Sequence, residues 1–141
     1  MSISARIAEQ IGPDIERPDL RDTLNKAEPL RLEDRTGRSG RHYLHLVYGL
    51  IECPVVPKTN YALVRRAADG SEAVLRVGRA SHDAPTLNLA QIRHEGALLG
   101  ANEVHLYILA RTEAERILVE FDLAAGLLGD AEVAPAEETW H

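Results

Sequence analysis

Residues 60–78 read NYALVRRAADGSEAVLRVG, two apolar runs on either side of a polar link. The link contains Asp69-Gly70, a dipeptide that favours tight turns with positive backbone angles. Apolar runs rich in Val and Leu on both sides of such a turn are typical of an antiparallel hairpin. The sequence therefore predicts a hairpin whose strands lie at 61–65 and 73–77.

Two helices and another strand are predicted after the hairpin. The first helix is expected to begin near Pro85 and to end at Gly100, since glycine is the usual C-terminal cap. Residues 104–110 are almost all apolar, which suits a central strand of a sheet. Thr112 with Glu115 three residues later forms a capping-box signature, which predicts the start of a last helix.

The composition predicts one α+β domain. A chain of 141 residues suffices for one core, and 45% hydrophobic with 27% charged residues is an ordinary globular composition. Residues 42–51 alternate and are rich in strand formers, so they predict an extra N-terminal strand. We expect a small, mostly antiparallel sheet flanked by helices in residues 43–128, between a partly irregular arm (1–42) and an acidic flexible tail (129–141).

Two features of the N-terminal arm leave alternatives open. Ile3, Ile7 and Ile11 would lie on one face of a short helix, which would pack on the domain or on a second copy and so make a homodimer. In the segment RTGRSGR, arginines stand at every third position over residues 35–41. Such a run would either grip phosphates or form an exposed, solvated loop.

Charge and cysteine content limit the classes of function. The net charge of -6 weighs against tight non-specific nucleic-acid binding, which needs clustered Lys and Arg, but it is compatible with a local basic patch. Cys53 is the only cysteine, so neither an internal disulfide nor a cysteine zinc cage is expected, which suits a reducing cytoplasm. No apolar run approaches the length of a membrane span, so no membrane partner is expected.

The predicted order of hairpin, helix, strand and helix resembles the GIY-YIG nuclease superfamily. The likeness covers residues 60–123, with Tyr61 on the first strand, Val77-Gly78 closing the second, and Glu120 inside the last helix. This resemblance implies a three-stranded core sheet flanked by helices. It also implies phosphodiester hydrolysis of nucleic acid with one divalent metal ion, Mg²⁺ or Mn²⁺.

The resemblance implies roles for five residues. Glu120 would hold the metal, because a carboxylate is a hard oxygen ligand, and Tyr61 would position or deprotonate the attacking water. Arg79 and Arg93 would act in catalysis by binding phosphate and offsetting charge in the transition state. Arg76 stands where the family has its second tyrosine, and Arg76 and Arg79 are the expected nucleic-acid contacts.

Three functions stay open on the sequence alone. The first is a metal-dependent nuclease, which requires Tyr61, Arg79 and Glu120 to converge on one cleft. The second is a catalytically inactive nucleic-acid- or protein-binding module of the same fold, in which Arg76 serves binding. The third is a structural homodimer, in which Tyr61 is a core residue and Glu120 forms an ordinary ion pair with Arg116.

Overall fold

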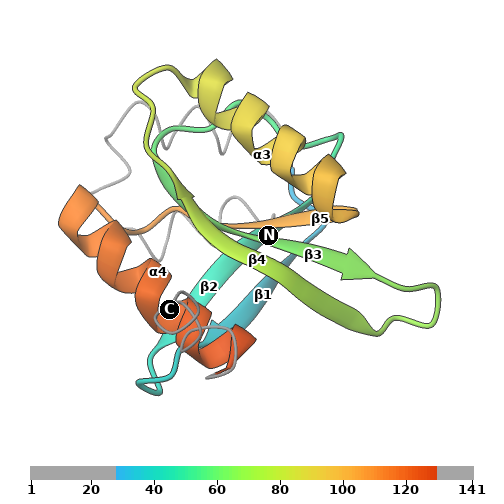
Figure 1. Cartoon of the computed structure of the whole chain (residues 1–141), viewed down its shortest axis with the longest axis horizontal. Helices are drawn as coiled ribbons and strands as arrows, with labels where there is room; N and C mark the ends of the chain where they lie inside the picture. The colour runs from blue at the N-terminus through green and yellow to red at the C-terminus, as the bar shows by residue number, and fades with distance from the viewer. Residues whose placement is uncertain (1–27, 130–141) are drawn as a thin grey trace, which may run out of the picture.

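The computed structural model describes residues 28–129, and within them it has five strands and two helices. The strands form one antiparallel sheet in the order β1-β2-β5-β3-β4, with one helix on each side (Figure 1). This confirms the predicted α+β class. The elements are β1 (Arg31–Thr36), β2 (His42–Gly49), β3 (Thr59–Arg66), β4 (Glu72–Ala80), α3 (Pro85–Leu99), β5 (Glu103–Tyr107) and α4 (Glu113–Leu128).

The predicted hairpin is strands β3 and β4. Tyr61 pairs with Gly78, and the turn between the strands contains Gly70 at φ +90°, a backbone conformation that side-chain-bearing residues rarely adopt. Strand β5 pairs with β3 on one side and with β2 on the other, which confirms its central position. The unit of hairpin, helix, strand and helix predicted over residues 60–123 is therefore present.

Both helices begin and end close to where local signals predicted. Pro85 opens α3, and Gly100 caps its C-terminus in the left-handed conformation at φ 83°. At the start of α4, Thr112 Oγ1 accepts a hydrogen bond from Glu115 N at 3.1 Å, and Glu115 Oε1 accepts one from Arg111 N at 2.7 Å. The reciprocal bonds satisfy backbone donors that a helix start leaves free.

Strand β1 lies inside the arm that was expected to be partly irregular. Its residues RLEDRT do not show the apolar alternation of an ordinary half-buried strand. Arg31, Glu33 and Arg35 share one face, and that face is lined by other charged groups rather than by an apolar core. The sheet therefore begins at Arg31, upstream of the boundary placed between residues 42 and 43.

Side chains alternate between two separate cores on the two faces of the sheet. On the face covered by α3, the core is built around Tyr61, Leu63, Leu106 and Ile92. The face covered by α4 has a smaller core, whose members are Tyr43, Ala62, Val64, Val77, Ala110, Val119 and Leu123. Adjacent residues of one strand therefore belong to different cores.

The sheet curves so strongly that its two edge strands approach each other. In Figure 1 the strands β1 and β2 run across the direction of β3 and β4. Arg35 on β1 forms hydrogen bonds with Glu72 on β4, although three strands separate them in the sheet. Helix α4 contacts both edge strands, and at Gly126 it lies so close to the β1–β2 loop that a Cβ would meet Arg38 N at 2.7 Å.

The ends of the chain are not covered by this description. The predicted helix with Ile3, Ile7 and Ile11, its proposed homodimer contact and the acidic tail from residue 130 onward lie outside the described residues. Within residues 28–129, neither helix has the length and apolar character needed to cross a membrane.

Candidate functional site

Tyr61 is buried on the α3 face, which it shares with Arg76 of the neighbouring strand. Its hydroxyl donates a hydrogen bond to Glu95 Oε1 at 2.5 Å and accepts one from Gln91 Nε2 at 3.0 Å. Arg76 Nη1 lies 3.6 Å from the same Glu95 oxygen. Burial, reinforced by the bond to Glu95, raises the pKa of Tyr61. The phenolate that a catalytic base would need is therefore disfavoured.

Arg79 and Glu120 meet on the opposite face, beside α4. Arg79 Nη1 donates to Glu120 Oε1 at 2.6 Å, and Arg79 Nε donates to Glu113 Oε2 at 2.9 Å. Ser81 Oγ donates to that same Glu113 oxygen at 3.0 Å. Both carboxylates thus already have an arginine as counter-ion. The alternative ion pair between Arg116 and Glu120 is absent from this part of the structure, where Arg116 Nε bonds Glu113 instead.

Arg93 lies on the outer part of α3 and holds a loop. Its Nη2 donates to the backbone carbonyl of Ile51 at 2.7 Å and to that of Cys53 at 3.1 Å. These bonds tie the segment after β2 to the helix. Cys53 itself is buried, which raises its thiol pKa to about 12, so it is not a nucleophile at neutral pH.

The structure does not bring the five residues named by the resemblance into one cleft. Tyr61 and Arg76 lie on the α3 face, whereas Arg79 and Glu120 pair on the α4 face. Arg93 binds backbone carbonyls of a loop. The physical reason is the alternation of a strand, since Arg76 and Arg79 are an odd number of residues apart.

A network of charged groups, of which Arg35, Glu103 and His105 are buried, occupies the α4 face at the end nearest the β3–β4 turn. His105 Nδ1 accepts from Arg35 Nε at 3.2 Å, and His105 Nε2 donates to Glu103 Oε1 at 3.0 Å. Arg66 Nε donates to Glu103 Oε2 at 3.0 Å, and Arg35 donates to both oxygens of Glu72 at 2.9 and 3.1 Å. This interior ion network consists of Arg31, Glu33, Arg35, Arg66, Glu72, Glu103 and His105.

The interior ion network balances its own charge. Three arginines face three glutamates around a histidine that is fully buried. Burial opposes ionisation of Glu103, but hydrogen bonds from Arg66, His105 and Arg31 outweigh it and lower its pKa to about 2. Burial lowers the pKa of His105, and its Nδ1 accepts a hydrogen bond from Arg35, which an unprotonated ring nitrogen does. The arrangement is typical of a structural polar core, in which every charge has a partner.

Three members of this network could hold a metal ion. Single ligand atoms of Glu33, Glu72 and His105 lie within 4.8 Å of one another, and no other such group occurs among residues 28–129. Glu120, the metal ligand that the resemblance implies, is not part of the group. Arg35 and Arg66 already donate to Glu72, so a cation bound there would have to displace guanidinium groups.

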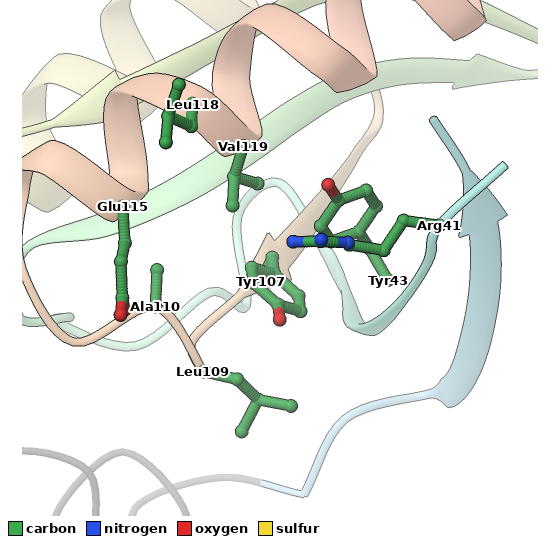
Figure 2. A pocket seen from close by; sticks show the side chains of 8 residues that line it. All are labelled: Arg41, Tyr43, Tyr107, Leu109, Ala110, Glu115, Leu118 and Val119. Carbon is green, nitrogen blue, oxygen red and sulfur yellow. The ribbon is translucent and has the colours of Figure 1, made fainter. Parts of the chain in front are cut away.

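A hollow of about 190 Å³ opens between the sheet and the first half of α4 (Figure 2). Tyr43 and Tyr107 form its floor and contact each other edge to face, with ring centroids 5.2 Å apart. Tyr43 OH donates to Asp122 Oδ2 at 2.8 Å, which fixes that ring. We call this feature the α4 hollow; its lining is Arg41, Tyr43, Tyr107, Leu109, Ala110, Glu115, Leu118 and Val119.

The Arg41 guanidinium has no hydrogen-bond or ion-pair acceptor among residues 28–129. Of the other two arginines in the run over 35–41, Arg35 belongs to the interior ion network, and Arg38 also has an interaction partner. Figure 2 shows the Arg41 guanidinium beside Tyr43 and Tyr107. The arginine run is therefore neither one phosphate grip nor one solvated loop, because its members have different roles.

Three large apolar side chains of α4 are exposed, and one of them, Leu118, lines the α4 hollow. Leu118 is 69% exposed and Phe121 is 67% exposed, with Ile117 next to them. Apolar groups that gather beside a recess, rather than being scattered singly, are typical of an interaction site. The α4 hollow, with Leu118 at its edge, is a candidate binding surface in the described residues.

Comparison with known proteins assigns this chain to no family. No family model matches this chain, and neither does any curated protein or solved structure. Fold and site together define an α+β protein with a curved five-stranded antiparallel sheet, a network of ion pairs on one face of the sheet and a hollow beside α4. The resemblance of residues 60–123 to GIY-YIG nucleases stays a prediction.

Proposed function

We propose that this chain is a catalytically inactive binding module with a GIY-YIG-like core, and that the α4 hollow binds an acidic, aromatic peptide segment. The observation that carries the proposal is the Arg41 guanidinium, which has no hydrogen-bond or ion-pair acceptor among residues 28–129 and lies at the edge of a hollow lined by tyrosine and aliphatic side chains. Such a site offers one cation and an apolar recess. A ligand with one carboxylate beside one ring matches both.

The charges around the α4 hollow favour a peptide over a nucleic acid. Glu115 lines the hollow, and Asp122 lies next to Tyr43. A phosphate backbone needs several cations in a row, and the lining of the α4 hollow contains one, Arg41. Arginine binds a carboxylate well through its planar fork, and tyrosine rings pack favourably against another aromatic ring.

The positions of Tyr61, Arg79 and Glu120 support inactivity of the GIY-YIG-like core. Hydrolysis would need Tyr61, Arg79 and Glu120 around one scissile phosphate, and these side chains belong to two faces of the sheet. The raised pKa of Tyr61 further disfavours its use as a base. A nuclease would have to rearrange both the Tyr61–Glu95 and the Arg79–Glu120 contacts.

The resemblance implies Mg²⁺ or Mn²⁺ at Glu120, whereas the three ligand atoms that lie close enough to share one ion belong to Glu33, Glu72 and His105. We propose that Arg35 and Arg66 serve as the counter-ions of this group and that the folded protein needs neither metal. Mg²⁺ in particular prefers oxygen ligands in a regular octahedron, which a group containing a histidine and bound by two arginines does not offer.

Peptide binding tests the proposal directly. A fluorescein-labelled peptide with Glu two residues before Trp should bind saturably to the full-length chain carrying Trp140→Ala, measured by fluorescence anisotropy. Arg41→Gln in the same background should weaken binding about tenfold, because a charge-assisted hydrogen bond is lost. Arg65→Gln is the matched control, since Arg65 bonds only the Gly100 carbonyl at the other end of β3.

Three results would overturn the proposal. One is the absence of saturable peptide binding. Another is binding that Arg41→Gln leaves unchanged, which would place the ligand elsewhere. The third is tighter, salt-sensitive binding of a labelled single-stranded oligonucleotide than of the peptide, which would favour the nucleic-acid alternative.

A further inference from the structure

Inside the interior ion network, three side chains lie close enough to share one metal ion. Single ligand atoms of Glu33, Glu72 and His105 are within 4.8 Å of one another. His105 is fully buried, whereas the side chains of Glu33 and Glu72 are each 28% exposed. An ion can therefore reach the group from solvent, past the two carboxylates, and be bound at its inner end by an imidazole.

The hydrogen bonds of His105 leave a lone pair that faces a cation. Nε2 donates to Glu103 Oε1 at 3.0 Å, so Nδ1 is the unprotonated nitrogen, and it accepts from Arg35 Nε at 3.2 Å. Histidines that bind metals usually donate their other N–H to a carboxylate in the same way, which fixes the ring. The Arg35 guanidinium thus stands where a metal ion would bind Nδ1.

A second buried histidine lies beside the group with a nitrogen that has no partner. His45 is directly opposite Glu33 in the pairing of β1 with β2, and its ring centroid is 6.5 Å from that of His105. Its Nδ1 donates to the Tyr43 carbonyl at 2.8 Å, so Nε2 carries a lone pair, and no group among residues 28–129 donates to it. Nε2 faces away from Tyr43, and His105 lies on that side, opposite Val47. Buried acceptors are rarely left without a partner, and a bound ion would supply one.

The exposure of the three arginines decides which of them a metal ion would replace. Arg66 is 25% and Arg31 is 37% exposed, so both can turn into solvent, whereas Arg35 is 5% exposed. Arg66 Nη2 lies 3.0 Å from Glu72 Oε1 and 3.6 Å from Glu33 Oε1. Arg66 therefore supplies the positive charge that a metal ion bound by these two carboxylates would supply instead.

Charge stays balanced in this exchange. Without Arg31 and Arg66, a divalent ion and Arg35 supply three positive charges against the three glutamates of the network. Arg35 releases His105 but keeps its hydrogen bond from Nη1 to Glu72 Oε2, at 3.1 Å. Because a buried charge without a counter-ion is costly, this balance is what permits a divalent ion in the network.

We propose that the interior ion network binds one Zn²⁺ ion through two carboxylates and two imidazoles, those of Glu33, Glu72, His45 and His105. Zn²⁺ takes four nitrogen and oxygen ligands, whereas Mg²⁺ prefers six oxygens. Glu33 is on β1 and Glu72 is on β4, so the ion joins the two edge strands of the curved sheet. The zinc site shares no ligand with the lining of the α4 hollow, and peptide binding does not depend on it.

Zinc and cobalt titrations of the full-length protein test the site. Isothermal titration calorimetry should show one Zn²⁺ ion bound per chain, and the protein should unfold at a higher temperature with Zn²⁺ than without it. Co²⁺, a spectroscopic substitute for Zn²⁺, should give the strong visible absorption of a four-coordinate ion. Glu33→Gln removes a partly exposed ligand and should weaken Zn²⁺ binding at least about tenfold.

Arg66→Ser should have the opposite effect. It removes the cation that competes with Zn²⁺, so binding should become about tenfold tighter, the equivalent of one charge-assisted hydrogen bond. A histidine site elsewhere on the surface would not respond to this change. His94→Gln is the matched control, since His94 is exposed on α3, and it should leave Zn²⁺ binding unchanged.

The zinc site is rejected if the full-length protein binds no Zn²⁺, or if its Co²⁺ complex has the weak spectrum of a six-coordinate ion. It is rejected equally if Zn²⁺ binding is insensitive to Glu33→Gln and to Arg66→Ser, or if His94→Gln abolishes it. Both substituted side chains of the network are partly exposed, so circular dichroism should show a native fold in each variant. Should Glu33→Gln not fold, the direction of the Arg66→Ser effect decides.

Discussion

The two faces of the sheet use the same strands for opposite purposes. The face under α3 is a continuous apolar core with one polar cluster, Tyr61 with Gln91 and Glu95. The face under α4 has a smaller apolar core, a buried set of ion pairs and the α4 hollow. Alternate residues of the same strands therefore build an apolar core on one face and a network of ion pairs with a hollow on the other.

Loss of a buried charge on the α4 face should lower the free energy of unfolding more than loss of a buried hydroxyl on the α3 face. Glu103→Gln leaves Arg31, Arg66 and His105 without their shared carboxylate, so the free energy of unfolding should fall by about 2 kcal/mol. Tyr61→Phe on the α3 face removes the hydrogen bonds of the hydroxyl with Glu95 and Gln91 and should cost about 1 kcal/mol. Urea unfolding measures both values.

The exposed pair Lys58–Asp83 provides the control for that comparison. Asp83→Asn should cost less than about 1 kcal/mol, because both side chains face solvent. Equal losses in Glu103→Gln and Asp83→Asn would mean that the interior ion network contributes nothing special to the α4 face.

Acid should lower the free energy of unfolding through the buried histidines of the α4 face. Burial lowers the pKa of His45 from 6.5 to about 3, against the effect of its Nδ1 bond to the Tyr43 carbonyl, and His45 Nε2 has no partner among the described residues. Below about pH 6.5 the unfolded chain binds protons that the folded chain does not. The free energy of unfolding should therefore fall as pH drops, by up to about 1.4 kcal/mol per pH unit for each such histidine.

His45→Gln isolates this effect. Between pH 6.5 and 4.5, above the range in which Glu103 contributes, the variant should lose stability less steeply than the wild type. His105, whose pKa is also lowered by burial, accounts for the remaining slope. Parallel slopes for the two proteins would show that His45 is protonated in the folded state.

Local signals in the sequence were sufficient for most of the fold. The Asp69-Gly70 turn, the Thr112 cap and the apolar run of β5 each follow from short-range physics. Strand β1 could not be predicted in this way. Its inward residues are Arg31, Glu33 and Arg35, whose partners lie far along the chain, so its pattern is not that of a core strand.

The candidate site was harder to predict because it depends on which strands are neighbours. Tyr43 and Tyr107 were both placed on strands, but only the pairing of β2 with β5 brings their rings together. Arg41 was singled out in a run of three arginines, yet the sequence does not tell that Arg35 is internal. The resemblance suggested Tyr61 and Arg79 together, and strand alternation separates them.

The most direct test of the central claim, binding without cleavage, is a nuclease assay. Purified full-length protein is incubated with labelled single- and double-stranded DNA and RNA in Mg²⁺ or Mn²⁺, beside Glu120→Ala. The account predicts no cleavage above the buffer control in either protein. Cleavage by the wild type that disappears in Glu120→Ala would contradict it, since Glu120 would then act on a substrate rather than only pair with Arg79.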